Sequence, residues 1–193
     1  MSDTYHHGNL REALIEEGIR IINESGEDAL SLRKVASACN VSHAAPYAHF
    51  KDKDELIEAI KESVTEQLMA EMEDAVKAAA NSETAIVGMG KRYVSFFRGK
   101  PDYFKFLFGR QNITAHLRID EKGDDDYPPF VLLKETYLKY LKENGIKKSR
   151  KKKEVELLKI WASAHGLAAI ACMSGVIPSF DWDEMLEGDD LMR

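Results

Sequence analysis

The fold of this protein is decided by residues 31–56, which have the sequence SLRKVASACNVSHAAPYAHFKDKDEL. Ser31 precedes a short run with helical apolar spacing, and serine is a residue type that caps helix N-termini. Asn40 ends that run and accepts the left-handed backbone conformation of a tight turn. Ser42 can then cap a further helix. Two short helices joined by a turn of about four residues are the outline of a helix-turn-helix.

Positive charge is concentrated on this same stretch. The first sixty residues contain six basic and eleven acidic side chains, whereas residues 31–53 contain four basic side chains and the single acid Asp52. Because DNA presents rows of phosphates beside its grooves, a helix-turn-helix with this charge predicts DNA binding. The alternative is an ordinary three-helix unit with a solvated charged face.

Helices are also predicted for the rest of the chain. Nine Val, thirteen Ile and five Thr stand against twenty Ala and seventeen Leu, a balance that favours helices over strands. Asn9, with Glu12, is the expected cap of the first helix, which Gly26 ends. Further helices are expected over 54–80, from the break at 81–82 to 99, over 101–108, 130–141 and 155–176, and from Ser179 or Asp181 onward.

The predicted fold is therefore all-α, with about nine helices: an N-terminal three-helix helix-turn-helix domain and a C-terminal helical bundle. Nothing rich in Pro or Gly separates the two halves. The boundary is expected at the start of the long helix, with a DNA-binding domain over 1–54 and an effector-binding and dimerisation domain over 55–193.

Composition excludes several classes of protein. A formal charge of −6 argues against coating nucleic acid over the whole surface, and two cysteines are too few for a disulfide scaffold. A reducing cytoplasm is the expected location. Residues 160–178 are uncharged apart from His165, but they are dominated by Ala, Ser and Gly, so a buried helix is favoured over a membrane span.

Residues 31–56 resemble the N-terminal DNA-binding domain of the TetR (tetracycline-repressor) family of bacterial transcription regulators, and the length and helix order of the whole chain fit that family. Residues 93–109, with Trp161, His165 and Gly166, resemble the subgroup of the family named for Trp-His-Gly. The features that carry the first resemblance are Val35 with Ala36, the turn before Val41 and Ser42, the run Tyr47, His49 and Phe50, and Lys53 with Leu56.

Two residues depart from the family pattern. Asn40 stands where the family usually has Gly, and Asn also accepts a left-handed turn. Pro46 stands in the recognition helix where a larger apolar residue is usual, and there it removes about one hydrogen bond. Because this helix has few long polar side chains, base discrimination is expected to depend on Arg33, His43, thymine methyl contacts and DNA shape.

The expected DNA contacts fall into two groups. Tyr47, His49 and Lys53 are expected to hold phosphates, and a lysine at a helix start opposes the helix dipole, which suggests an external anion. Arg33 and His43 are expected to approach base edges. The full set is Arg33, Lys34, Ser42, His43, Ala44, Ala45, Tyr47, His49 and Lys53.

Other candidate chemistry is weak. The sequence contains no nucleophile–base pair and no metal-ligand spacing, so no enzymatic activity, metal or cofactor is expected. The basic run 147–153 is interpreted as a solvated helix–helix loop rather than a second nucleic-acid patch, and the acidic run 120–126 as a solvated loop. His165 is either a packed core residue or part of a ligand site.

Two apolar faces on the predicted helix over 155–176 indicate a homodimer. One face contains Val155 and Leu158 and the other contains Leu157 and Trp161, and a monomer's own core can use only one of them. The residues expected at the dimer interface are Ala162, Ala168, Ala169, Cys172 and Val176.

Aromatic residues are abundant in the second half. Most are needed for packing, but adjacent rings that cannot share one helix face, opposite Ala and Gly on the long helix, favour a cavity for a neutral or weakly polar effector. The expected effector-binding residues are Tyr93, Phe97, Phe104, Phe108, Tyr137, Trp161 and His165.

Taken with the resemblance, these features predict a transcriptional repressor. It would act as a homodimer on a palindromic double-stranded operator, without a membrane partner, and a small apolar or aromatic effector would release it. Two alternatives stay open: a small-molecule-binding or enzymatic helical protein whose N-terminal domain does not bind DNA, and a constitutive DNA-binding dimer without an effector.

Overall fold

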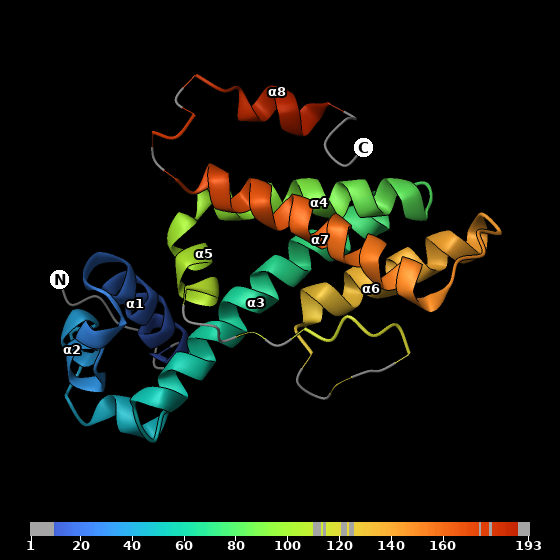
Figure 1. The fold of residues 1–193 in the computed structure, drawn as a ribbon. Helices are drawn as coiled ribbons and strands as arrows, with labels where there is room; N and C mark the ends of the chain where they lie inside the picture. Colours follow the sequence, from blue (N-terminus) through green and yellow to red (C-terminus); the bar gives the residue numbers. More distant parts are fainter. Residues whose placement is uncertain are drawn as a thin grey trace. The chain divides into compact units, whose positions relative to one another are not determined.

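The computed structural model describes residues 10–109, 113, 115–120, 123, 126–173, 175–177 and 179–188. Every regular element in these residues is helical, which confirms the predicted all-α class (Figure 1). In chain order they are α1 (Leu10–Ser25), η1 (Glu27–Ala29), α2 (Leu32–Ala38), η2 (Ala45–Ala48), α3 (Lys53–Ala78), α4 (Ser82–Gly99), α5 (Pro101–Phe108), α6 (Pro128–Glu143), α7 (Arg150–Ala171) and α8 (Trp182–Glu187), where η marks a 3-10 helix.

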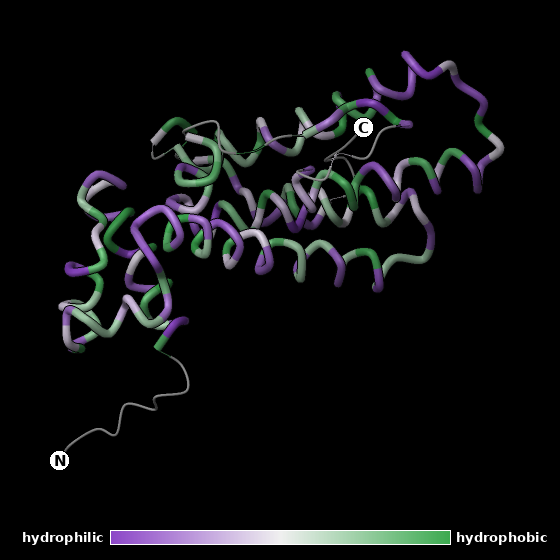
Figure 2. Tube along the Cα trace, turned by 90° about the horizontal axis from the view of Figure 1, so that it is seen from below, coloured by the Kyte–Doolittle hydropathy of each residue, from purple (hydrophilic) through white to green (hydrophobic). Residues whose placement is uncertain are grey.

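The chain forms two compact units, which meet between Val64 and Thr65 inside α3. Along the helices of both units, hydrophobic and hydrophilic positions alternate (Figure 2), as amphipathic helices that each bury one face require. No helix of the described residues is long and apolar enough to cross a membrane.

The first unit is a small helical domain with its own core. Leu14 of α1, Val35 of α2 and Ile60 of α3 are fully buried, and each such side chain contributes about 1.5–3 kcal/mol. α1 lies so close to α3 that a Cβ on Gly18 would stand 2.7 Å from Cδ1 of Ile60. Glycine at this position therefore permits the close contact between the two helices.

The local signals around α2 act as predicted. The Ser31 hydroxyl accepts a hydrogen bond from the Lys34 amide at 3.2 Å, which caps the helix. Asn40 has a φ of 55°, the left-handed conformation that turns the chain after α2. The predicted cap at Asn9 lies outside the described residues.

The third helix of the helix-turn-helix is shorter than predicted. η2 is one 3-10 turn over Ala45–Ala48, and the structure gives it no side-chain cap from Ser42. Pro46 stands in the first turn of η2, where its missing amide proton removes about one hydrogen bond. Pro46 is buried, and its carbonyl accepts hydrogen bonds from the amides of His49 and Phe50.

In the second unit α4 packs against both α6 and α7, and Figure 1 shows α4 and α7 running alongside each other. α4 begins at a capping box, in which the Asn81 side chain accepts from the Thr84 amide and the Thr84 hydroxyl accepts from the Asn81 amide. α8 begins at Trp182, directly after Asp181, which is one of the two expected starts, and the Asp181 carboxylate accepts from the amides of Asp183 and Glu184.

Two charged stretches differ from the expected solvated loops. The basic run 147–153 continues into α7, which Ser149 caps by accepting from the Lys152 amide at 3.4 Å. Asp126, at the end of the acidic run, is buried with a side chain 2% exposed and accepts from the amides of His116 and Gly123. Its ion pair with buried Lys134, at 3.6 Å, compensates the burial of both charges.

Candidate functional site

The predicted DNA contacts lie on the turn and flanking helices of the first unit. Arg33, Lys34, Ser42, His43 and Ala44 are exposed, and Ala45 and His49 are half-buried. Tyr47 is 56% exposed, a large fraction for an aromatic ring. An exposed ring with a terminal hydroxyl can reach a phosphate oxygen without any change in the core.

Ser37 holds His43 beside α2. Its hydroxyl donates to the Arg33 carbonyl at 3.0 Å and lies 3.1 Å from Nε2 of His43. A hydroxyl can donate one hydrogen bond and accept others, so Ser37 connects the two residues that are predicted to approach base edges. The sequence could indicate the hydrogen bond from Ser37 to Arg33, because the two residues are four apart in a predicted helix. The contact between Ser37 and His43 depends on the turn that follows the helix.

Lys53 takes part in the packing of its own unit. Its ammonium group donates to the Glu27 carbonyl at 2.7 Å and so connects the start of α3 to η1. An ammonium has three donors, so two are left for a phosphate.

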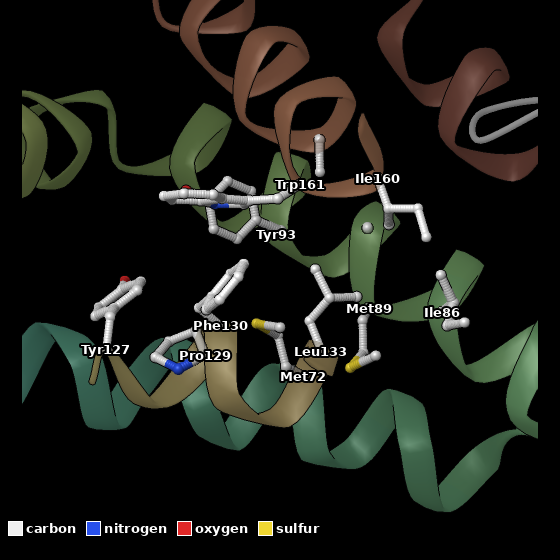
Figure 3. Close-up of a pocket in the computed structure, with 12 residues that line it drawn as sticks. Met72, Ile86, Met89, Tyr93, Tyr127, Pro129, Phe130, Leu133, Ile160 and Trp161 are labelled. Carbon is white, nitrogen blue, oxygen red and sulfur yellow. The ribbon is translucent and has the colours of Figure 1, made fainter. Parts of the chain in front are cut away.

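A buried apolar cavity lies in the second unit between α3, α4, α6 and α7. Its open volume is about 20 Å³, which is room for about one water molecule. Figure 3 shows side chains from these helices converging on it, with the sulfur atoms of Met72 and Met89 among them. The lining residues are Met72, Ile86, Met89, Gly90, Tyr93, Tyr127, Pro129, Phe130, Leu133, Ile160, Trp161 and Ala164.

Tyr127 brings an unsatisfied polar group to this cavity. Its side chain is buried, and its hydroxyl has no hydrogen-bond partner among the described residues. Burial raises the pKa of Tyr127 well above its ordinary value. A buried hydroxyl without a partner costs about 1–3 kcal/mol, so a ligand that offers it a hydrogen bond would recover that energy.

Only part of the predicted effector set lines the cavity: Tyr93 and Trp161 do, whereas Tyr137 lines an open groove instead. The other four predicted residues form an aromatic cluster centred on His165. The His165 ring centroid lies 4.9 Å from that of Phe104, 4.6 Å from that of Phe108 and 5.8 Å from that of Trp161, and the Phe97 ring packs on Phe104 at 5.3 Å.

His165 is packed and hydrogen-bonded. Its Nδ1 lies 2.9 Å from the Tyr93 hydroxyl, which lines the cavity. Burial lowers the pKa of His165, so the imidazole is neutral at pH 7. Together with Phe108 and Trp161, His165 also lines an open hollow of about 310 Å³. The residue thus connects the aromatic cluster to the cavity wall.

The structure divides the predicted dimer residues between two faces of α7. Ala168 is 0% exposed and lies in the core of its own unit, so its side chain cannot contact a partner; this prediction was wrong. Ala162 is exposed, and Ala169 and Cys172 are half-buried. Val176, which follows α7, is exposed.

The residues that sequence reasoning missed come from several elements. Met72, Tyr127, Pro129 and Leu133 line the cavity but lie far from the aromatic runs that suggested it. Apolar spacing indicated a buried face for Met72 in the predicted helix over 54–80, whereas Tyr127 and Pro129 precede the helix predicted over 130–141. Only the packing of these segments in the second unit shows which residues face the cavity.

Comparisons with known proteins agree with this architecture. The model of the family described as bacterial regulatory proteins, tetR family, matches residues 14–60. The chain is 30% identical over 135 residues to the tetracycline repressor protein class D of Escherichia coli, in an alignment that covers 70% of this chain and 55% of that repressor. The chain thus spans about half the length of the curated relatives it matches.

Two solved structures resemble the whole chain. A protein with unknown function from Rhodococcus sp. RHA1 is 26% identical with a TM-score of 0.74, covering 96% of this chain and 93% of that one. AibR, in complex with isovaleryl coenzyme A and operator DNA, is 15% identical with a TM-score of 0.66, covering 92% and 94%, and shows the fold alone. The helix-turn-helix region 14–60 thus matches the family described as bacterial regulatory proteins, tetR family, and the sequence relatives and the shared fold extend the similarity over most of the chain.

Proposed function

We propose that this protein is a DNA-binding transcriptional repressor. In the proposal, residues 1–54 bind a palindromic operator as part of a homodimer, and residues 55–193 dimerise and bind a small effector that releases the DNA. The observation that carries the proposal is the helix-turn-helix of the first unit, whose cations at Arg33 and Lys34 are exposed. The operator-bound complex of AibR and the tetracycline repressor relative support it.

The exposed apolar face of α7 supports the homodimer. Val155 is 43% exposed and Leu158 is 42% exposed, whereas Leu157 and Ala164 on the opposite face are buried. Large apolar side chains in a row on one helix face are the usual signature of a partner surface. We place the interface on this face, with Ala162, Ala169, Cys172 and Val176.

The buried cavity supports the effector site. An apolar group would displace the side chains of Met72 and Met89, which are unbranched and change conformation easily. The hydroxyls of Tyr93 and Tyr127 would supply its polar contacts. We also assign the second unit to the Trp-His-Gly subgroup, because Trp161 and His165 pack together next to the cavity.

A second candidate function is a constitutive DNA-binding dimer. The small volume of the cavity favours it, since room for about one water molecule leaves none for an effector unless side chains move.

The proposal is tested by a mobility-shift assay with the DNA upstream of the protein's own gene. We expect a single retarded complex that competitor DNA of unrelated sequence does not displace. The double variant Arg33→Ala, His43→Ala is the matched control and should abolish the specific complex. Failure of the wild-type protein to select any upstream sequence would overturn the DNA-binding assignment.

A further inference from the structure

The buried cavity continues toward a groove on the surface of the second unit. Ile86 and Ile160 line both the cavity and an open groove of about 690 Å³ between α4, α6 and α7. In Figure 3 these two isoleucines lie at one end of the cavity, and Tyr127 and Pro129 lie at the other. The side chains of Ile86 and Ile160 therefore separate the apolar cavity from the groove.

The groove in turn continues toward the start of α7. Lys148, Glu156 and Lys159 line both the groove and a second open hollow. Figure 2 shows that the connection between α6 and α7 is mostly hydrophilic. The cavity, the groove and the hollow thus lie in series, each sharing lining residues with the next, between the apolar interior and a basic surface.

Positive charge predominates in the groove and the hollow. The groove and the hollow together contain six lysines and two glutamates, in a chain whose formal charge is −6. The lysines are Lys91, Lys147, Lys148, Lys151, Lys152 and Lys159, and the glutamates are Glu83 and Glu156.

The negative charge of one of the two glutamates, Glu156, is already balanced by a paired lysine. Oε2 of Glu156 accepts from the ammonium group of Lys148 and from the hydroxyl of Tyr137, each at 2.6 Å. The hydrogen bond from Lys148, followed by that from Tyr137, lowers the pKa of Glu156, so this carboxylate is ionised at pH 7. Glu156 therefore fixes Lys148 and Tyr137 at the junction of groove and hollow.

The other lysines of the hollow stand where the helix itself disfavours cations. α7 begins with four basic residues, 150–153, at the positive end of its dipole. Arg150 is paired with Asp120 at 2.8 Å and with Glu154 at 2.9 Å. Of the described residues, none forms an ion pair with Lys151 or Lys152. An anion bound here would interact with the lysines and with the helix dipole.

We propose that the effector is amphipathic, with an apolar chain and a head group of more than one negative charge. The chain passes Ile86 and Ile160 into the cavity, and the head binds Lys148, Lys151 and Lys152 at the start of α7. This inference rests on the proposed function, which places the effector in the same cavity, and it adds the charge of the effector and the side from which it enters.

The test is calorimetric titration of the full chain with three probes: octyl phosphate, octan-1-ol and inorganic phosphate. We expect octyl phosphate to bind about tenfold more tightly than octan-1-ol, because it adds contacts with several lysines to the same apolar chain. Inorganic phosphate has no chain and should not saturate the protein at millimolar concentration.

Variants distinguish binding of the charged head group from binding of the octyl chain. The double variant Lys151→Gln, Lys152→Gln should weaken octyl phosphate about tenfold and leave octan-1-ol unchanged. Lys105→Gln, Lys142→Gln removes two exposed lysines outside the groove and the hollow and is the matched control for charge. Ile160→Trp should weaken both octyl compounds by filling the passage. Ile160→Ala, which widens it, should accelerate their association, and thermal unfolding checks that each variant is folded.

Each contrary result has a distinct meaning. Equal affinity for octyl phosphate and octan-1-ol, unaffected by the lysine variants, would overturn the anionic head and leave the apolar effector site standing. Tight binding of inorganic phosphate, or octyl phosphate affinity unchanged in the Ile160→Trp variant, would overturn the connection between hollow and cavity. If no octyl compound binds while the upstream DNA is still selected, the inference and the effector part of the proposed function fail, and the DNA-binding part stands.

Discussion

At the scale of single residues, Lys53 and Tyr127 show how one polar group can affect both stability and binding. The Lys53 ammonium donates to the Glu27 carbonyl and keeps two donors for a phosphate. The Tyr127 hydroxyl has no partner among the described residues although it is buried beside the cavity. The Lys53 ammonium therefore stabilises the free protein, whereas the Tyr127 hydroxyl would be stabilised only by a hydrogen bond from a ligand.

Lys53→Ala should therefore affect both stability and DNA binding. Loss of the hydrogen bond to Glu27 should cost about 1 kcal/mol in the free energy of unfolding. Loss of a phosphate contact should weaken all DNA sequences similarly and reduce the salt slope of log K by about one. Urea unfolding and filter binding at several salt concentrations measure the two effects. A changed preference at one base pair would contradict the phosphate assignment.

Arg33→Ala is the matched variant for a base contact. It should cost about 1–3 kcal/mol of binding free energy and relax specificity at a single base pair. Selection from a randomised operator measures this. Equal losses on every sequence would make Arg33 a backbone contact.

Tyr127→Phe should stabilise the ligand-free protein by about 1 kcal/mol, because it removes a buried hydroxyl that has no partner and keeps the ring. Chemical denaturation measures the change, and Tyr47→Phe, at an exposed hydroxyl, is the control with no expected change in stability. A loss of stability in the Tyr127 variant would show that the hydroxyl has a partner in the folded protein.

At the scale of elements, α7 and the segment before α6 each combine two roles. α7 buries Leu157, Ala164 and Ala168 in its own unit and exposes Val155 and Leu158. The segment before α6 is held by Asp126, which accepts hydrogen bonds from two backbone amides and from the His116 imidazole. A substitution on the exposed face of α7 should therefore change dimerisation, whereas one on its buried face or at Asp126 should change the stability of the second unit.

The two faces of α7 should respond differently to a carboxylate. Leu158→Glu places a charge on the exposed face and should yield a folded monomer. Ala168→Glu places it in the core and should unfold the second unit, since an unpaired buried charge costs several kcal/mol. Sedimentation velocity and thermal unfolding distinguish the two results. Wild-type protein sedimenting as a 22 kDa species at micromolar concentration would exclude the dimer.

The Asp126 anchor should make stability sensitive to acid. Burial alone would raise the pKa of Asp126. This effect is outweighed by hydrogen bonds from the His116 and Gly123 amides and the His116 imidazole, and by the charge of Lys134, which together lower the pKa to about 2. The folded-state pKa lies below the unfolded one, so Asp126 stabilises the fold above about pH 4 and loses that contribution as the pH falls toward 2.

Asp126→Asn should thus lower the free energy of unfolding by about 2 kcal/mol at pH 7. The wild-type protein should lose this advantage over the variant between about pH 4 and pH 2. Urea unfolding of both proteins across this range measures it. A difference between them that does not change with pH would contradict the assignment.

At the scale of the whole molecule, the two units share α3, which contributes to the core of each. Ile60 of α3 is buried in the first unit and Met72 of α3 lines the cavity in the second. An effector can release DNA only if it binds the released conformation more tightly than the DNA-bound one. α3 is the covalent connection between the unit that lines the cavity and the unit that contains the helix-turn-helix.

Linkage then makes a reciprocal prediction. If octyl phosphate weakens operator binding by some factor, operator DNA must weaken octyl phosphate binding by the same factor. Thermal shifts and calorimetric titrations with and without operator DNA measure the two factors. An affinity for octyl phosphate that operator DNA leaves unchanged would exclude the coupling, while still allowing binding in the cavity.

The sequence by itself determined the features that depend on neighbouring residues. Ser31 caps α2 where predicted, and Asp181, one of two expected starts, caps α8, because a cap needs only a side-chain oxygen and the next amides. Asn40 adopts the predicted left-handed turn because few residue types accept it. The all-α class follows from the same local preferences, and the offsets among residues 31–56 pointed to the helix-turn-helix and its family.

Tertiary structure alone decided which side chains meet. Periodicity identified two apolar faces on α7, but only packing against α4 shows that Ala168 lies on the core side. Asp126 belongs to an acidic run typical of solvated loops, yet it is buried and is held by the amides of His116 and Gly123 and by Lys134. Phe97 and Tyr137 carry the aromatic character of a ligand site but lie outside the cavity wall. Such placements depend on contacts between residues far apart in the chain, which local sequence patterns do not contain.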